Sequence, residues 1–271
     1  MNPLDIAAIP EKIRGNVQVN LPFRMRHLYM ESFLALGLNP EIGIDAETLD
    51  NVGMEEFKAV ARAFQKKGRR ITLHGPFMDL SPGSPDPAIR RASMERMQQF
   101  LDVLVVFEPF SVVCHGGWES RRYDWIRDAW YQNAVVFWKE VAGFVKKRRS
   151  RLYLENVYED KPEDMLSLLE LLHSEGVGFC LDTGHTAAFG SRDLSRWVAV
   201  LGAFVCEIHL HDNKGVSDAH LPPGQGKIDF SALKILLQGK GERPFLTLEP
   251  HEEKNLYPSL DWIARELGDL F

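Results

Sequence analysis

Short apolar runs alternate with longer amphipathic stretches along the whole chain. Runs such as ITL, SVVC, LYL, VGFCL and FLTL have almost no polar interruption. This texture is typical of parallel strands that are covered on both faces. The pattern predicts eight strands, at residues 15–21, 40–45, 70–74, 111–115, 151–155, 177–182, 205–211 and 244–249.

The segments that follow these runs have helical periodicity, because apolar residues return at three- and four-residue spacing. Pro162 near the start of one such segment and Gly176 just past its end are typical of helix termini. We therefore expect helices at residues 26–36, 54–67, 87–107, 124–147, 162–175, 193–203, 231–238 and 257–267.

Eight strands that are each followed by a helix favour a closed (β/α)₈ TIM barrel of the α/β class. The competing architecture is an open, doubly wound sheet, which a glycine-rich phosphate turn would favour, but the motif G-x-G-x-x-G is absent. No linker or change in composition divides the chain, so residues 1–271 are predicted to form a single domain.

Composition places the chain among soluble globular proteins, with 45% hydrophobic and 26% charged residues. The net charge of −6 lowers the expectation of nucleic-acid binding without excluding a local basic patch. The N-terminal residues lack the pattern of a signal peptide, and no stretch is apolar enough for a membrane span. We expect a cytoplasmic protein, and the sequence leaves its oligomeric state open.

Three widely spaced cysteines, Cys114, Cys180 and Cys206, lie in apolar runs. An odd number with this spacing indicates reduced thiols rather than a disulfide framework. We expect their side chains to fill the outer layer of the barrel wall, away from His115.

Acidic and imidazole side chains recur where the predicted strands end and in the loops directly after them. They are His74, His115, Glu155, Asp182, His185, Glu207, His209, His211, Asp218, His220 and Glu249. In a barrel these strand ends converge on one rim, where TIM-barrel enzymes have their active sites. Carboxylates gathered there without lysine or arginine would repel one another, and a divalent cation would neutralise them. Mixed His/Asp/Glu ligation suits Zn²⁺, Mn²⁺, Co²⁺ or Fe²⁺ better than Ca²⁺.

The seventh strand offers more than one possible metal ligand. Glu207 and His211 share a face with His209 because side chains on a strand alternate with a period of two. We choose His209 as the ligand, and either of the others replaces it if the strand register differs by two residues.

Several motifs carry a resemblance to a known family. LHGPF, VVCHGGW, LYLENVY, FCLDTGH, IHLHDNKGVSDAHLPPGQG and TLEP resemble the xylose isomerase-like TIM barrel superfamily. This superfamily includes isomerases and epimerases of sugars and sugar phosphates, and abasic-site nucleases of the endonuclease IV type (AP endonuclease family 2). The similarity extends from the third strand to the eighth.

The resemblance to the isomerases and epimerases of carbohydrate metabolism implies one metal held by Glu155, Asp182, His209 and Glu249. In such enzymes the metal polarises substrate oxygens while two glutamates, here Glu155 and Glu249, carry a proton to and from the adjacent carbon. His185 would then hold a substrate oxygen. The remaining candidates for substrate binding are His220, which would cover the site, Trp118 as an apolar wall and Lys214 near a phosphate.

By the same resemblance, the chain also has ligand-type residues at the five further ligand positions of a trinuclear nuclease. These are His74, His115, His185, Asp218 and His220. Three metals there would activate a water for hydrolysis of a phosphodiester at abasic DNA.

Departures from the nuclease pattern decide the ranking. Glu159 adds an acid where a phosphate backbone would pass, and His211 stands where the nuclease motif has asparagine. The basic cluster at 146–149 precedes the fifth strand, so it belongs at the opposite end of the barrel. We therefore rank a metal-dependent isomerase or epimerase of a small sugar, sugar phosphate or polyol first. The abasic-site nuclease is the alternative, and a non-catalytic sugar-binding barrel ranks third.

Overall fold

The computed structural model describes residues 3–239 and 243–271. Eight parallel strands close into a barrel in the order of the chain, and β1 pairs with β8 to complete it. The strands are β1 Val17–Pro22, β2 Asn39–Gly43, β3 Thr72–His74, β4 Ser111–His115, β5 Arg151–Glu155, β6 Gly178–Asp182, β7 Val205–Leu210 and β8 Phe245–Leu248. This confirms the predicted α/β class and the single-domain (β/α)₈ TIM barrel.

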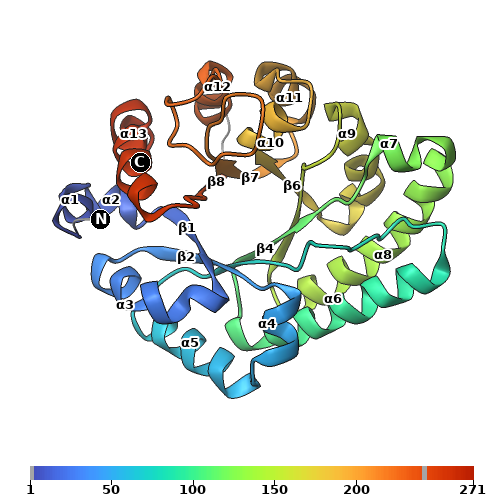
Figure 1. Cartoon of the computed structure of the whole chain (residues 1–271), viewed down its shortest axis with the longest axis horizontal. Coiled ribbons are helices and arrows are strands. Elements are labelled where there is room, and N and C mark those ends of the chain that lie inside the picture. The colour runs from blue at the N-terminus through green and yellow to red at the C-terminus, as the bar shows by residue number, and fades with distance from the viewer. Residues whose placement is uncertain (1–2, 240–242) are drawn as a thin grey trace.

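Helices surround the strands (Figure 1). The α-helices are α1 Pro3–Ala8, α2 Glu11–Arg14, α3 Arg26–Leu36, α4 Ala46–Asn51, α5 Met54–Lys66, α6 Pro87–Phe107, α7 Ser120–Tyr123, α8 Arg127–Lys147, α9 Pro162–Leu172, α10 Thr183–Ala188, α11 Leu194–Leu201, α12 Ser231–Gly239 and α13 Leu256–Glu266. Short 3₁₀ segments are η1 Phe23–Met25, η2 Asp124–Ile126, η3 His173–Glu175, η4 Glu253–Asn255 and η5 Gly268–Leu270. Within the described residues, no helix is long and apolar enough to cross a membrane.

The long predicted helices are confirmed, and α3 and α6 have the predicted bounds. The sequence analysis missed short helices such as α4 and α10, because one or two turns carry too little periodicity. These helices begin at capping carboxylates instead. Asp45 accepts a hydrogen bond from the Thr48 backbone N–H at 2.8 Å, and Asp182 accepts one from the His185 N–H at 2.6 Å.

The interior of the barrel corrects the expectation for two of the cysteines. Cys114 belongs to the main core between the strands and the helices, as expected. Cys180 instead packs with Val113 and Tyr153 inside the barrel, because it shares the inward face of Asp182 two residues later. The register between β6 and β7 shifts here, so Cys206 is an extra residue and also packs against this inner cluster.

Candidate metal centre

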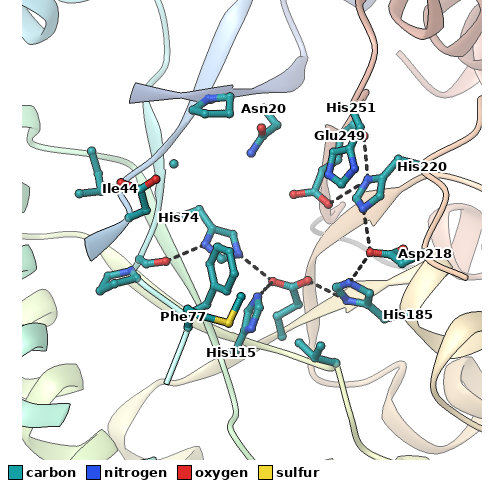
Figure 2. Close-up of a pocket in the computed structure, with 18 of the residues that line it drawn as sticks. Asn20, Ile44, His74, Phe77, His115, His185, Asp218, His220, Glu249 and His251 are labelled. Atoms are coloured by element: carbon teal, nitrogen blue, oxygen red, sulfur yellow. Dashed lines mark hydrogen bonds and ion pairs between the residues drawn. The ribbon is translucent and has the colours of Figure 1, made fainter. Parts of the chain in front are cut away.

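The strand ends deliver the predicted side chains to one mouth of the barrel. His74, His115, Glu155 and Asp182 are the last residues of β3, β4, β5 and β6. The β4–β5 register pairs His115 with Glu155, and the β6–β7 register pairs Asp182 with His209, so these side chains stand at neighbouring positions. Figure 2 shows His74, His115, His185, Asp218, His220 and Glu249 around one space.

Glu155 lies at the centre of the site, and four imidazoles surround its carboxylate. Its Oε2 atom is 3.0 Å from His74 Nε2 and 3.5 Å from His115 Nε2. Its Oε1 atom is 3.1 Å from His185 Nδ1 and 3.5 Å from His209 Nδ1. Burial alone would raise the pKa of Glu155, but the histidines outweigh burial and hold that pKa well below its ordinary value.

Two histidines beside Glu155 have pKa shifts in opposite directions, although burial lowers the pKa of both. Burial would lower the pKa of His74, but its hydrogen bond to Glu155 and the charge of that carboxylate raise the pKa to about 9. Burial dominates at His115 and lowers its pKa to about 3. His115 is therefore neutral near pH 7, which is the form of imidazole that binds metal ions.

Asp182 forms a second group of ligand-type side chains. One of its oxygens is 3.0 Å from His211 Nε2, and the other is 3.5 Å from His185 Nδ1. The glycine of the DTGH motif makes this arrangement possible. A Cβ atom on Gly184 would lie only 1.9 Å from the His211 ring, so a larger residue would displace that imidazole.

Asp218 and His220 reach the mouth from the loop after β7. Asp218 Oδ2 is 2.9 Å from His220 Nε2 and 3.4 Å from His185 Nε2. Burial opposes ionisation of Asp218, but these two histidines lower its pKa well below the ordinary value. The His220 ring stacks between His211 and His251, with ring centroids 3.8 and 3.4 Å away.

The loop that carries these residues is organised around one buried carboxylate, Asp212. Its two oxygens accept five backbone N–H groups, from Asn213, Gly224, Gly226, Lys227 and Ile228. Gly226 leaves room for this contact, because a Cβ there would lie 2.2 Å from Asp212 Oδ1. Asp212 thus fixes the segment that follows Asp218 and His220.

The donor atoms fit a divalent cation. Among the described residues, groups with ligand atoms within 4.8 Å of one another are His74/His115/Glu155, Glu155/Asp182/His209, Asp182/His185/His211, His211/Asp218/His220 and Glu41/Glu207/His209. Both ring nitrogens of His209 and Nδ1 of His211 are buried without a hydrogen-bond partner. Imidazole and carboxylate ligands with free lone pairs suit Zn²⁺, Mn²⁺, Co²⁺ or Fe²⁺.

All nine predicted ligand residues lie in this connected cluster. Both strand-seven histidines enter it: His209 Nδ1 is 3.5 Å from Glu155 and 3.3 Å from Glu249, whereas His211 contacts Asp182. The predicted substrate residues divide. His185, His220 and Trp118 line the cavity, although Trp118 is only 1% exposed and its ring stacks on Tyr131. Lys214 is exposed on its loop and is outside the cavity lining of the described residues.

Glu41 is a residue of the cluster that the sequence analysis missed. It lies in the middle of β2, and its Oε1 atom is 3.3 Å from His209 Nε2. The available signal was an acid inside an otherwise buried strand. Glu207, which the sequence analysis kept as an alternative ligand, lies below His209, where burial and the nearby Glu41 carboxylate raise its pKa to about 8.

A cavity of about 860 Å³ opens above the cluster. Its rim includes Phe77, Tyr158 and Phe189, which are 43%, 52% and 38% exposed. In the described part of the chain two arginines, Arg24 and Arg122, line the cavity, and no lysine does. The cavity is therefore large enough for a ligand bigger than a single small sugar, with limited positive charge.

Comparison with known proteins places this architecture in context. Residues 40–266 match the family model described as xylose isomerase-like TIM barrel. The uncharacterized protein MJ1311 of Methanocaldococcus jannaschii is 25% identical over 186 residues, which cover 66% of this chain and 64% of that protein. A probable endonuclease 4 of Mycobacterium leprae is 25% identical over 184 residues, covering 63% of this chain and 69% of the relative.

Two solved structures share the fold over nearly the whole chain. One is the TTHB071 protein from Thermus thermophilus, soaked with ZnCl₂, with 27% identity, a TM-score of 0.80 and coverage of 94% of this chain and 98% of that one. The other is a D-tagatose 3-epimerase-like protein with 19% identity, a TM-score of 0.77 and coverage of 93% and 97%.

Proposed function

The chain belongs to the xylose isomerase-like TIM barrel family, and from that premise we propose that it is a divalent-metal-dependent hydrolase of a phosphoester, with a multinuclear centre. The observation that carries this proposal is the environment of Glu155. Both of its oxygens face imidazoles, two on each side. Glu155 would therefore serve in two ligand groups, one with His74 and His115 and the other with Asp182 and His209.

This environment also argues against a proton-shuttle role for Glu155. A general base needs a free lone pair within reach of the substrate proton. Both glutamates line the cavity, but Glu155 is 1% exposed and has four nitrogen neighbours, whereas the Glu249 side chain is 11% exposed. We therefore assign Glu249 as the carboxylate that holds a proton facing the substrate and Glu155 as a ligand. On this basis we rank phosphoester hydrolysis ahead of the isomerase or epimerase that the sequence favoured.

The ligands would come from three neighbouring groups, of which the first two share Glu155. His74, His115 and Glu155 form one group, Glu155, Asp182, His209 and Glu249 the second, and His185, Asp218 and His220 the third. Divalent ions held there supply Lewis-acid stabilisation of a phosphoryl group and activation of an attacking water.

The rim favours a small phosphate ester over a long nucleic acid. Arg24 and Arg122 provide positive charge for one phosphate group, and the chain as a whole has a net charge of −6. The names of similar proteins, a probable endonuclease 4 and a structure soaked with ZnCl₂, support metal-dependent phosphoester chemistry. Zn²⁺ and Mn²⁺ are the cations that we propose first.

Sugar epimerisation at a single metal is the second candidate. The observation that favours it is the position of His209, whose Nδ1 atom is 3.5 Å from Glu155 and 3.3 Å from Glu249. Together with Asp182, these residues form the four-residue set expected for a single metal. The aromatic rim residues Phe77 and Tyr158 also suit the carbon face of a sugar.

Metal stoichiometry combined with an activity panel distinguishes the two candidates. Metal-stripped protein is reloaded with Zn²⁺ or Mn²⁺, and ions per chain are counted by native mass spectrometry. The panel contains bis(p-nitrophenyl) phosphate, sugar phosphates, an abasic oligonucleotide, and ketoses in D₂O. We expect two or three ions and release of nitrophenol or phosphate. Glu155→Gln should remove at least one ion and lower the rate at least 100-fold, whereas the exposed Glu252→Gln is the matched control.

One ion per chain together with deuterium incorporation into a ketose would establish the epimerase instead. Binding of no divalent ion would refute both enzyme candidates.

A further inference from the structure

A fully buried polar layer lies inside the barrel below the proposed metal centre. The layer consists of Gln18, Glu41, Thr72, Ser111, Glu207 and Thr247, each 0% exposed. TIM-barrel interiors are usually filled by branched apolar side chains. A buried carboxylate costs free energy unless a hydrogen bond or an ion pair compensates it. The two glutamates of this layer therefore need an explanation.

The two glutamates have different partners. Glu207 accepts hydrogen bonds from the hydroxyls of Ser111 and Thr247, at 3.1 and 2.6 Å. Within the described residues, Glu41 has no hydrogen-bond partner at either carboxylate oxygen. Its ion-pair contact is with His209, whose Nε2 atom is 3.3 Å from Glu41 Oε1.

His209 lies between this layer and the proposed centre. Its Nε2 atom faces Glu41 below, and its Nδ1 atom faces Glu155 and Glu249 above, at 3.5 and 3.3 Å. The ring is 0% exposed, so water does not compete for either nitrogen. A neutral imidazole has one N–H and one lone pair, and the partner of one nitrogen decides what the other nitrogen presents.

We propose that Glu41 is a positioning residue for the metal ligand His209. The 3.3 Å contact between Glu41 Oε1 and His209 Nε2 is an ion-pair contact without hydrogen-bond geometry in this structure. With an ion bound, the Glu41 carboxylate would accept the Nε2–H of His209, which would keep the proton on Nε2 and leave the Nδ1 lone pair for the ion held with Glu155 and Glu249. Carboxylates that orient ligand histidines in this way typically change metal affinity 10- to 100-fold. The inference rests on the proposed metal centre, and it assigns a function to a buried acid that contacts no substrate.

A matched pair of variants tests the proposal. Glu41→Gln and Glu207→Gln make the same substitution in the same buried layer, but only Glu41 contacts His209 Nε2. Zn²⁺ affinity is measured by competition with a chromophoric chelator, and ions per chain by native mass spectrometry. We expect Glu41→Gln to weaken the affinity of one ion 10- to 100-fold at unchanged stoichiometry. We expect Glu207→Gln to stay within about threefold of the wild type.

The tautomer of His209 gives a readout that a merely structural role would not change. Long-range ¹H–¹⁵N spectra of the Zn²⁺-loaded wild type should show a proton on His209 Nε2 and none on Nδ1, assigned by loss of the signal in His209→Gln. This measurement needs no Glu41 variant, so it tests the proposal even where Glu41→Gln fails to fold. An Nδ1–H form in the wild type would overturn the proposal.

Three affinity results would also overturn it. One is an unchanged affinity in Glu41→Gln, and another is an equal loss in both variants, which would reflect general destabilisation of the layer. The third is the loss of one whole ion in both variants, which would mean that Glu41, Glu207 and His209 hold an ion themselves. A wild type that binds no ion overturns the proposed function as well, whereas a metal-binding wild type with an unaffected Glu41→Gln overturns this inference alone.

Discussion

Two glutamates four residues apart show how neighbours decide the state of a buried side chain. Glu155 and Glu159 are each 1% exposed. Histidines around Glu155 hold its pKa well below the ordinary value. Glu159 accepts a hydrogen bond from the Val157 backbone N–H at 2.6 Å, and burial dominates, which raises its pKa to about 8.

The raised pKa of Glu159 predicts a pH-dependent loss of stability. Its folded pKa of about 8 exceeds the ordinary value of 4.5. The stabilisation by the protonated form is therefore complete below pH 4.5 and is lost as the pH rises through 8. Relative to Glu159→Gln, the wild type should lose free energy of unfolding between these limits, at up to about 1.4 kcal/mol per pH unit. Urea denaturation of both metal-free proteins at several pH values measures this difference.

The exposed Glu170→Gln is the control for that series and should follow the wild type at every pH. Parallel curves for the wild type and Glu159→Gln would contradict the assignment. Glu207 is present in both proteins, so its own titration cancels in the comparison.

Residues at strand ends were predictable from the sequence, but residues inside strands were not. His74, His115 and Glu155 follow apolar runs, so their place at the rim follows from the barrel topology. Glu41 was missed because an inward acid in mid-strand gives no periodic signal of its own. Trp118 follows a strand as a sugar-binding aromatic would, yet its packing on Tyr131 depends on α8, which is distant in the sequence.

At the scale of elements, the loop after β7 holds ligand-type residues in place without regular secondary structure. Asp218 and His220 belong to it, and Asp212 accepts five of its backbone N–H groups. Hydrogen bonds to a charged acceptor are worth about 1.5–3 kcal/mol each when removed. The positions of Asp218 and His220 therefore depend on a carboxylate whose oxygens accept backbone N–H groups.

Asp212→Asn should loosen this loop. The amide nitrogen replaces one oxygen and faces backbone N–H donors, so at least two hydrogen bonds are lost and the free energy of unfolding should fall by about 3 kcal/mol. Chemical denaturation measures the global loss, and limited proteolysis detects cleavage near residues 212–228. Asp229→Asn is the matched control in the same segment, because Asp229 accepts the Ser231 N–H and asparagine caps a helix equally well. Equal effects of the two variants would contradict the role of Asp212.

Long elements were predicted more accurately from the sequence than short ones. The sequence predicted α3 and α6 with their observed bounds because several turns reveal the helical period. The register shift between β6 and β7 has no such signature, since one extra residue leaves the apolar pattern intact. It brings Cys206 against the inner cluster, which the simple alternation of strand side chains did not predict.

At the scale of the whole molecule, the mouth concentrates negative charge in a protein whose net charge is already −6. Glu155, Asp182, Asp218 and Glu249 meet there, and histidines are their ion-pair partners among the described residues. Divalent ions would relieve the repulsion, so metal binding and folding should be coupled.

Removal of metal should therefore destabilise the folded chain. Binding at 100 times the dissociation constant adds about 2.7 kcal/mol, which corresponds to a rise in Tm of about 5–10 °C for a chain of this size. Differential scanning calorimetry with Zn²⁺ and then with excess EDTA measures the shift. Glu155→Gln should lose most of it, and Ca²⁺ should produce little because the site is rich in imidazole. Identical melting with Zn²⁺ and with EDTA would contradict the coupling.

The single carboxylate surrounded by four imidazoles has a consequence for how the centre fills. In the proposed centre, ions that share Glu155 would not load independently, because the first would draw on the carboxylate that the next one needs and would add positive charge beside it. Occupancy should then rise in successive, progressively weaker steps, visible as separate inflections in a calorimetric titration. When metal is scarce, partly filled forms of the protein would be present. The rate of the proposed hydrolysis would then rise gradually with the metal concentration instead of switching on at one concentration.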